Sequence, residues 1–305
     1  MIERAASGLP SDFRSRLLID RYSSVLSRLP LRRQAALADP RCPDTEIWNI
    51  FRTLAQVDPA LWLPRLMALG GIRLLPEAEA LSAGFALTLW KRVKPPPERL
   101  SWLRQRALGG ELRPPVGRKR KGRVIPLSEL RDELKIRARR RLPLEEPVEL
   151  DVVVKCPSLA LFVAIPRTAD TPGEPAASDE KRTRLLRLVD AGLAYAEGRS
   201  RMQRRPVSFS LLVLAQSLEA QESWSLALRR LLSSSLRRQL PHRTGLPDPA
   251  SLNGRFGVGA WAGAKRLLHD LRPHVSDPFE ATLLDRLLQH ARPLEARRIG
   301  QGAAS

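Results

Sequence analysis

Residues 147–167, PVELDVVVKCPSLALFVAIPR, decide the fold of this 305-residue chain. They predict two short strands, Val148–Val154 and Leu159–Ile165, joined by a turn of Lys, Cys, Pro and Ser. Both runs are rich in Val, Leu, Ile and Phe, which favour strands that are buried on at least one face. Asp151 lies inside the first run, and it needs a partner or a metal because buried carboxylates are seldom left alone.

Helices and a further strand are predicted on both sides of this pair. After it, a helix is expected over about 179–197, a buried strand over 207–215, and helices over 223–238, 261–271 and 278–290. Before it, the first third is expected to be wholly helical, including an amphipathic helix over 76–92. This pattern predicts a helical N-terminal region (1–112), a basic linker (113–126) and an α/β core with C-terminal helices (127–298).

The charge balance favours a polyanionic partner. Lys and Arg number 52 against 32 Asp and Glu, so the net charge is +20 and the pI is about 11.3. A field of this size favours nucleic acid, and DNA is the preferred partner in this interpretation. The alternative is compositional, because a high-GC genome uses Arg where other genomes use neutral polar residues.

The most basic stretch is RPPVGRKRKGR at 113–123, followed by a helix predicted over 127–142. Its prolines, glycines and adjacent like charges predict an exposed loop, and it either contacts phosphates or is a solvated linker. Phosphate contact is favoured because the next helix adds further cations. The candidate nucleic-acid-binding residues are Arg118, Lys119, Arg120, Lys121, Arg123, Arg137, Arg139, Arg140 and Arg141.

Other functional patterns are weak. The two cysteines and four histidines lack the spacing of metal ligands, and two separate thiols are typical of a reducing cytoplasm. Glycines 254, 257, 259 and 263 are not followed by the Lys-Ser/Thr of a phosphate-binding loop, and no strand is predicted to run directly into them. The chain has no signal pattern at its start and no apolar run of membrane-spanning length, so a soluble, cytoplasmic protein is expected.

The predicted order helix–strand–strand–helix–strand, with an acidic residue in the first strand, resembles the PD-(D/E)XK nuclease superfamily. The resemblance implies the restriction-endonuclease-like fold, an α/β (α+β) architecture with a mixed central sheet flanked by helices. It aligns Asp151 with the family Asp, which is followed in that family by a Glu-x-Lys at the end of the next strand. The two carboxylates hold Mg²⁺, and the lysine positions or activates water. Glu46 would match an acidic residue that some members place on the preceding helix; its alternative is first-turn capping.

The sequence departs from this motif, because Ala164-Ile165-Pro166 stands where Glu-x-Lys belongs. Ala164 cannot ligate a metal, and Pro166 offers neither charge nor a backbone donor. Either the chemistry is lost and no cofactor is needed, which is favoured, or the missing groups have moved and Mg²⁺ is retained. The migrated catalytic set would be Asp151, Glu180, Lys181 and Lys155, with Asp151 and Glu46 as metal ligands. Asp151 also has a structural alternative, a bond to the backbone or to an arginine such as Arg167.

Three functions follow from these patterns. The leading hypothesis is a DNA-associated protein with a degenerate nuclease-like site, in a defence or DNA-processing system. The second is an active, metal-dependent DNA endonuclease with a rearranged site. The third is a non-enzymatic adaptor whose basic faces contact RNA or an acidic protein.

Overall fold

The computed structural model describes residues 13–39, 42–73, 81–82, 84–111, 119–120, 123–124, 126–167, 170–173, 182–233 and 236–301. The chain divides into two compact units, one formed by residues 1–65 and 265–305 and the other by residues 66–264. No helix in the described ranges combines the length and the apolar character needed to cross a membrane.

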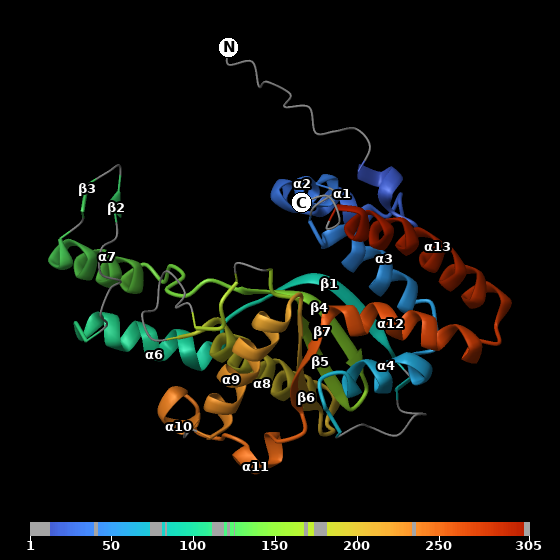
Figure 1. The fold of residues 1–305 in the computed structure, drawn as a ribbon. Helices are drawn as coiled ribbons and strands as arrows, with labels where there is room; N and C mark the ends of the chain where they lie inside the picture. Colours follow the sequence, from blue (N-terminus) through green and yellow to red (C-terminus); the bar gives the residue numbers. More distant parts are fainter. Residues whose placement is uncertain are drawn as a thin grey trace. The chain divides into compact units, whose positions relative to one another are not determined.

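The unit of residues 66–264 is built on a five-stranded mixed sheet (Figure 1). Its strands, in spatial order, are β1 (Ala86–Val93), β4 (Val148–Cys156), β5 (Leu159–Ala164), β6 (Ser208–Ala215) and β7 (Phe256–Ala260). The pairs β1–β4 and β4–β5 are antiparallel, whereas β5–β6 and β6–β7 are parallel. The expected mixed sheet flanked by helices is therefore present.

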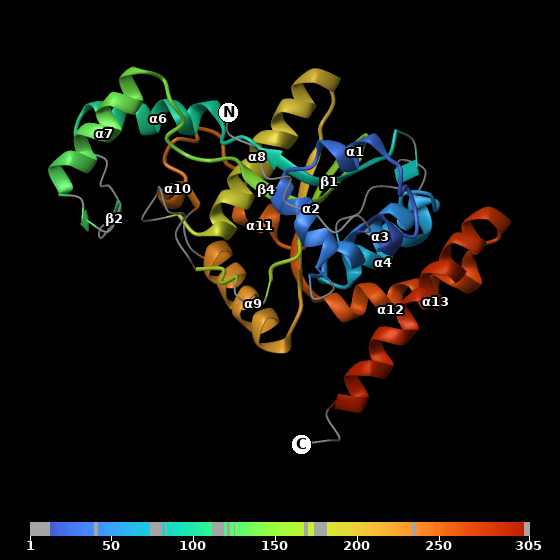
Figure 2. The ribbon, with the colours of Figure 1, turned by 90° about the horizontal axis from the view of Figure 1, so that it is seen from above.

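Helices supply the crossovers that parallel strands require. α8 (Arg184–Gln203) connects β5 to β6, and α9 (Leu218–Ser233) connects β6 to β7. The short helices α10 (Leu236–Gln239) and α11 (Pro249–Leu252) follow α9. Between β1 and β4 the chain forms α6 (Pro97–Leu108), the two-residue strands β2 (Lys119–Arg120) and β3 (Arg123–Val124), and α7 (Leu127–Arg139). We call α6, β2, β3 and α7 the basic arm; α6 and α7 lie side by side in both views (Figures 1 and 2).

The core of this unit lies between the sheet and the pair α8–α9. Phe162, Phe209 and Phe256, one from each of the parallel strands, stack edge to face, with ring centroids 5.2 and 5.3 Å apart. Trp224 of α9 is fully buried against the same cluster. Burial of such large apolar side chains is the main favourable contribution to folding, because it removes their surface from water.

The unit of residues 1–65 and 265–305 is helical. It contains the 3₁₀ turns η1 (Phe13–Arg16) and η2 (Arg272–His274), with α1 (Ser24–Arg28), α2 (Leu31–Ala38), α3 (Asp44–Leu54) and α13 (Pro278–Gln301). α4 (Pro59–Ala68) and α12 (Trp261–Leu271) each contain a boundary between the two units. α13 packs on α3, and the buried Arg33 on α2 pairs with Asp44 at the start of α3.

The expected helix over 76–92 is wrong from residue 86 onward, because Ala86–Val93 is strand β1. The prediction of a wholly helical first third therefore fails as well. Apolar residues of ALTLWKRV recur at i, i+3, i+4 and i+7, which is a helical spacing, so the local pattern does not indicate a strand. The conformation of this segment is set by antiparallel pairing of seven of its residues with β4, which lies far along the chain.

A second error concerns the region of glycines 254–263, in which no strand was predicted. Phe256–Ala260 is strand β7, and its glycines allow a close backbone approach. A Cβ at Gly257 would lie 2.0 Å from the carbonyl oxygen of Gly70, and one at Gly259 would lie 2.7 Å from that of Leu69. Gly257 and Gly259 therefore allow the backbone of Leu69 and Gly70 to pack directly against β7, an edge strand of the sheet.

Boundaries shift in three other places. The helix expected over 179–197 begins at Arg184, where the Thr183 hydroxyl accepts a hydrogen bond from the Leu186 amide, and it continues to Gln203. The helix expected over 223–238 is the longer α9 followed by the short α10. The expected basic loop over 113–126 contains the β2–β3 ladder, in which Arg120 pairs with Arg123.

Two glycines on α8 give a test of the packing between helix and sheet. A Cβ at Gly192 would fall 2.0 Å from the ring of Phe209, whereas one at Gly198 would meet nothing within 4 Å. We expect Gly192→Ala to lower the free energy of unfolding by about 1–3 kcal/mol through overpacking. Gly198→Ala is the matched control and should raise it by roughly 0.5–1 kcal/mol. Urea denaturation followed by circular dichroism measures both, and equal effects would contradict this packing.

Candidate functional site

The acidic residue singled out in the first central strand lies on β4, close to the carboxyl end of the neighbouring strand β5. Asp151 lies near the start of β4, and its Oδ2 accepts a hydrogen bond from the Ile165 amide at 2.7 Å. Ile165 follows the last residue of β5, so the carboxylate binds a backbone donor just beyond the end of that strand. The backbone bond expected as the structural alternative for Asp151 is thus present.

The strand opposite Asp151 has an unusual backbone. In the β1–β4 ladder, Leu89 pairs with Val152 and Lys91 with Leu150, and Trp90 lies between them with a φ of +49°. A positive φ is rare for a bulky side chain and costs about 1–3 kcal/mol. Such strain often marks functional positions, so this edge of the sheet remains the candidate site.

The other expected catalytic residues lie elsewhere or outside the described residues. Lys155 is on the same strand as Asp151 but four residues along it, roughly 13 Å away at the rise of a strand. Glu46 is on α3 in the other unit, where its carboxylate pairs with Lys265 at 2.9 Å. Glu180 and Lys181 lie outside the described residues.

An ion pair ties the end of β5 to the start of α8. The Arg167 amide donates to Oδ2 of Asp170 at 3.0 Å, and the Asp170 amide donates to the Arg167 carbonyl at 2.8 Å. The same Asp170 oxygen pairs with Arg184 in the first turn of α8. The carboxylate of Asp170 therefore has a structural role at this edge.

Mg²⁺ does not fit the residues found at this edge. Ala164 is the last residue of β5 and Pro166 lies just beyond it, and neither side chain can ligate a metal or transfer a proton. In the ranges that the structure describes, no three or more His, Cys, Asp or Glu residues gather into a group that could hold a metal ion. One carboxylate with a backbone donor on one oxygen is a poor match for an ion that prefers near-octahedral oxygen ligands.

The basic arm carries the described members of the expected nucleic-acid-binding set. Arg139, Arg140 and Arg141 are exposed at the end of α7, whereas Arg137 is partly buried and donates to the Pro143 carbonyl at 2.6 Å. Lys119, Arg120 and Arg123 lie in the β2–β3 ladder. Arg118 and Lys121 lie outside the described residues.

The base of the arm is fixed by an aromatic residue and an ion pair. Trp102 on α6 lies between two guanidinium groups, with Arg99 4.7 Å and Arg106 4.8 Å from its ring centroid. Arg99 is itself buried and donates to Oε2 of Glu145 at 3.0 Å. Glu145 lies just before β4, so this bond attaches the arm to the sheet.

Glu145 belongs to a larger buried cluster, which we call the ion network. Its members are Arg99, Glu145, Arg182, Asp190, His242 and Arg243, and each is at least nine-tenths buried. Arg182 bridges the two carboxylates, at 3.0 Å from Glu145 and 2.7 Å from Asp190. Nε2 of His242 lies 3.0 and 3.1 Å from the two oxygens of Asp190. Arg243 donates through Nε to the Asp190 carboxylate and through Nη2 to the Asp190 carbonyl.

Asp190 is the centre of this network, and its side chain is completely inaccessible to water. Burial alone would raise the pKa of its carboxyl group. The hydrogen bond with His242 and the charges of Arg182 and Arg243 outweigh burial, so the pKa lies well below its ordinary value. The carboxylate is therefore ionised in the folded protein and compensates two buried guanidinium groups.

Asp190→Asn tests this role because it keeps the shape of the side chain and removes its charge. Arg182 and Arg243 would then each lose one of two carboxylate partners, keeping only Glu145 and Glu197 respectively, and we expect a loss of about 3–5 kcal/mol in the free energy of unfolding. Asp132→Asn, on an exposed carboxylate of α7, should change it by less than about 0.5 kcal/mol. Guanidinium chloride denaturation measures both, and a small effect at Asp190 would show that the network contributes little.

The pH dependence gives an independent check. The pKa of Asp190 is lower in the folded protein than in the unfolded chain, so acid protonates the unfolded chain first. The stabilisation is complete above the unfolded value of about 4 and is lost progressively as the pH falls below it. We expect the stability difference between wild type and Asp190→Asn to be constant from pH 7 to pH 5 and to narrow towards pH 3. A difference that widens in acid would contradict this assignment.

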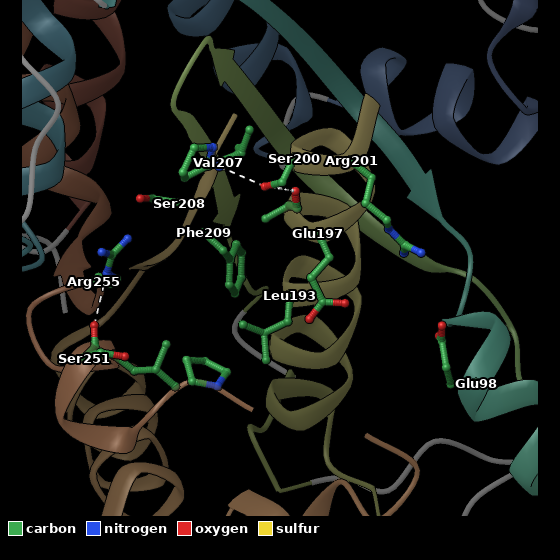
Figure 3. A pocket seen from close by; sticks show the side chains of 14 residues that line it. Glu98, Leu193, Glu197, Ser200, Arg201, Val207, Ser208, Phe209, Ser251 and Arg255 are labelled. Atoms are coloured by element: carbon green, nitrogen blue, oxygen red, sulfur yellow. Dashed lines mark hydrogen bonds between the residues drawn. The ribbon is translucent and has the colours of Figure 1, made fainter. Parts of the chain in front are cut away.

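A pocket of about 620 Å³ lies along the second half of α8 (Figure 3). Its lining comes from Glu98 of α6, the last three turns of α8, the start of β6, and the α11 region including Arg255. Glu197 on α8 faces the pocket and is bound by Arg243 at 2.8 Å. The network therefore fixes a carboxylate in the pocket wall.

Neither the network nor the pocket was expected from the sequence. One signal was available, because Asp190 lies within the buried stripe of α8, between Leu186 and Leu193. Its partners could not be found, since His242 is 52 positions away and nothing in the sequence around it marks burial.

Fold and site together define a mixed α/β protein with a helical unit, a strained sheet edge and a basic arm. Comparison with protein-family models, with curated proteins and with solved structures found no match in any of the three. The function is therefore argued from the residues of this chain.

Proposed function

We propose that this protein binds nucleic acid, with DNA preferred, through the basic arm, and that its nuclease-like core has a degenerate metal site. The observation that carries the proposal is the exposed arginine run at the end of α7. Arg139 is the last residue of that helix, and Arg140 and Arg141 lie beyond it. A cation in the last turn of a helix is favoured by the helix dipole. The helix dipole does not explain why Arg140 and Arg141, which lie beyond the helix, are also basic.

The composition of the β2–β3 ladder supports the same partner. Its four residues include Lys119, Arg120 and Arg123. A two-stranded ladder of this length is marginal by itself. Phosphates that bind to basic residues release counterions, so a polyanion would favour the ladder.

The core supports the resemblance to the PD-(D/E)XK superfamily through the order of its elements. α7, β4, β5, α8 and β6 follow one another as helix, strand, strand, helix and strand, with Asp151 in the first of these strands. Ala164 and Pro166 replace the second carboxylate and the lysine. A fold of this class without its metal ligands is suited to binding and lacks the groups for hydrolysis.

Binding is tested by fluorescence anisotropy with a short labelled DNA duplex at several salt concentrations. We expect affinity to fall linearly with salt on a log–log plot. The double variant Arg139→Gln/Arg140→Gln should weaken binding on the order of tenfold and lower the slope by about 2. Arg229→Gln/Arg230→Gln, on two exposed arginines of α9, is the matched control and should leave both unchanged. Equal losses in the two variants would show that overall charge, and not the arm, drives binding.

Cleavage is tested in the same samples with Mg²⁺ or Mn²⁺. We expect no cleavage of single- or double-stranded DNA, because the described edge lacks a second metal ligand. Metal-dependent cleavage that is abolished by Asp151→Ala would replace this proposal with that of an active nuclease whose site uses Glu180 and Lys181. Absence of any nucleic-acid binding would overturn the proposal and leave only an adaptor whose basic faces contact an acidic protein.

A further inference from the structure

The pocket beside α8 has the size and the mixed lining of a small-ligand site. Its volume of about 620 Å³ is within the range of roughly 300–1,000 Å³ that is typical of such sites. Leu193 and Leu252 supply apolar lining, and Phe209 faces it from β6 (Figure 3). A duplex cannot enter a cavity of this volume, but a single planar base can.

The carboxylates in the wall determine what the pocket recognises. Glu197 is held by Arg243, which is fixed on Asp190, yet 46% of the Glu197 side chain remains exposed. Glu98, the other acidic residue of the lining, is exposed on α6. Ionised carboxylates only accept hydrogen bonds, so the wall selects a ligand with adjacent donors.

Cations surround the same pocket. Arg201 lies one turn after Glu197 in the lining, and Arg204 and Arg205 follow it, all three exposed. Arg255 lines the opposite side, where its Nε donates to the Ser251 carbonyl at 3.0 Å. Arg199 does not belong to this group, because it donates to the carbonyls of Cys156 and Leu159. The exposed arginines are placed to bind phosphates outside the pocket.

We propose that this pocket binds one unstacked guanine of a single-stranded nucleic acid, whose phosphates lie on Arg201, Arg204 and Arg205. Guanine fits the wall because its Watson–Crick edge presents two adjacent donors, N1–H and the 2-amino group, to an acceptor such as Glu197. A base can enter only when it leaves its stack, and single strands permit this at little cost. The inference rests on the nucleic-acid binding proposed above and adds the strand type and the base.

The test uses the full chain and thymidine oligonucleotides of about twelve residues, within the site sizes known for single-strand binders. Each carries one central guanine or one central hypoxanthine, which lacks the 2-amino group. Wild type should bind the guanine strand on the order of tenfold more tightly, as expected for a specific base contact. Glu197→Ala should abolish the preference, and Glu222→Ala, on an exposed carboxylate of α9, should retain it. Thermal unfolding verifies that both variants are folded; Arg243 keeps its bonds to Asp190 when Glu197 is removed.

The outcomes separate this inference from the proposed function. Equal affinity for the two strands, with duplex binding retained, overturns the guanine site and leaves the proposed function in place. Absence of binding to every nucleic acid overturns both. Free guanosine monophosphate, titrated by calorimetry, separates the two sources of guanine: binding of the nucleotide without binding of the strand would show that the ligand is a nucleotide and that the strand proposal is wrong.

Discussion

The ionised carboxylate of Asp190 is the constraint on which the sheet-containing unit depends. Taking a charge out of water costs several kcal/mol, and the cost is recovered only when good geometry and further hydrogen bonds compensate it. Around Asp190 this requires Arg182, His242 and Arg243 to reach one helix position at once. These residues come from the segment before α8 and from the chain after α10. A conformation that misplaces either segment leaves a buried charge without its partner, so the network favours one arrangement over compact alternatives.

The same network connects the two surfaces to which functions are assigned. Arg182 pairs with both Asp190 and Glu145, and Glu145 also pairs with Arg99 at the base of the basic arm. Arg243 likewise pairs with both Asp190 and Glu197, and Glu197 lies in the wall of the pocket. Apolar packing could hold α6 and α8 in place, but it would not fix the direction of a half-exposed carboxylate. Guanidinium groups can, because their donors are arranged in a rigid planar fork. This gives a physical reason for an ionic cluster where a hydrophobic one would serve stability equally well.

The sequence predicts the helices and strands whose residue pattern is distinctive by itself. It fails for those whose conformation depends on contacts with residues far away in the chain. β4 and β5 were expected because runs rich in Val, Leu, Ile and Phe favour strands buried on at least one face, and β6 because it is almost wholly apolar. α8 and α12 were expected from their apolar spacing. β1 was mistaken for a helix since its conformation depends on pairing with β4, about sixty positions later. β7 was missed because Gly257 and Gly259 look like loop residues until the backbone of Leu69 and Gly70 is seen against them. At the candidate site, the acidic Asp151 within an apolar strand was visible in the sequence, whereas the positive φ of Trp90 opposite it was not.

Asp151 and Asp190 show how the same residue type serves different ends in one fold. Asp190 lies within α8 and contacts Arg182, His242 and Arg243. Its charge therefore stabilises the fold. Asp151 accepts a backbone amide at the edge of the sheet, opposite a strained residue, and the neighbouring strand offers it no second carboxylate. The strain at Trp90 is offset by the pairing of β1 and β4 on both sides of it. Asp190 thus stabilises the fold through its charge, whereas Asp151 fixes the position of the backbone that follows β5.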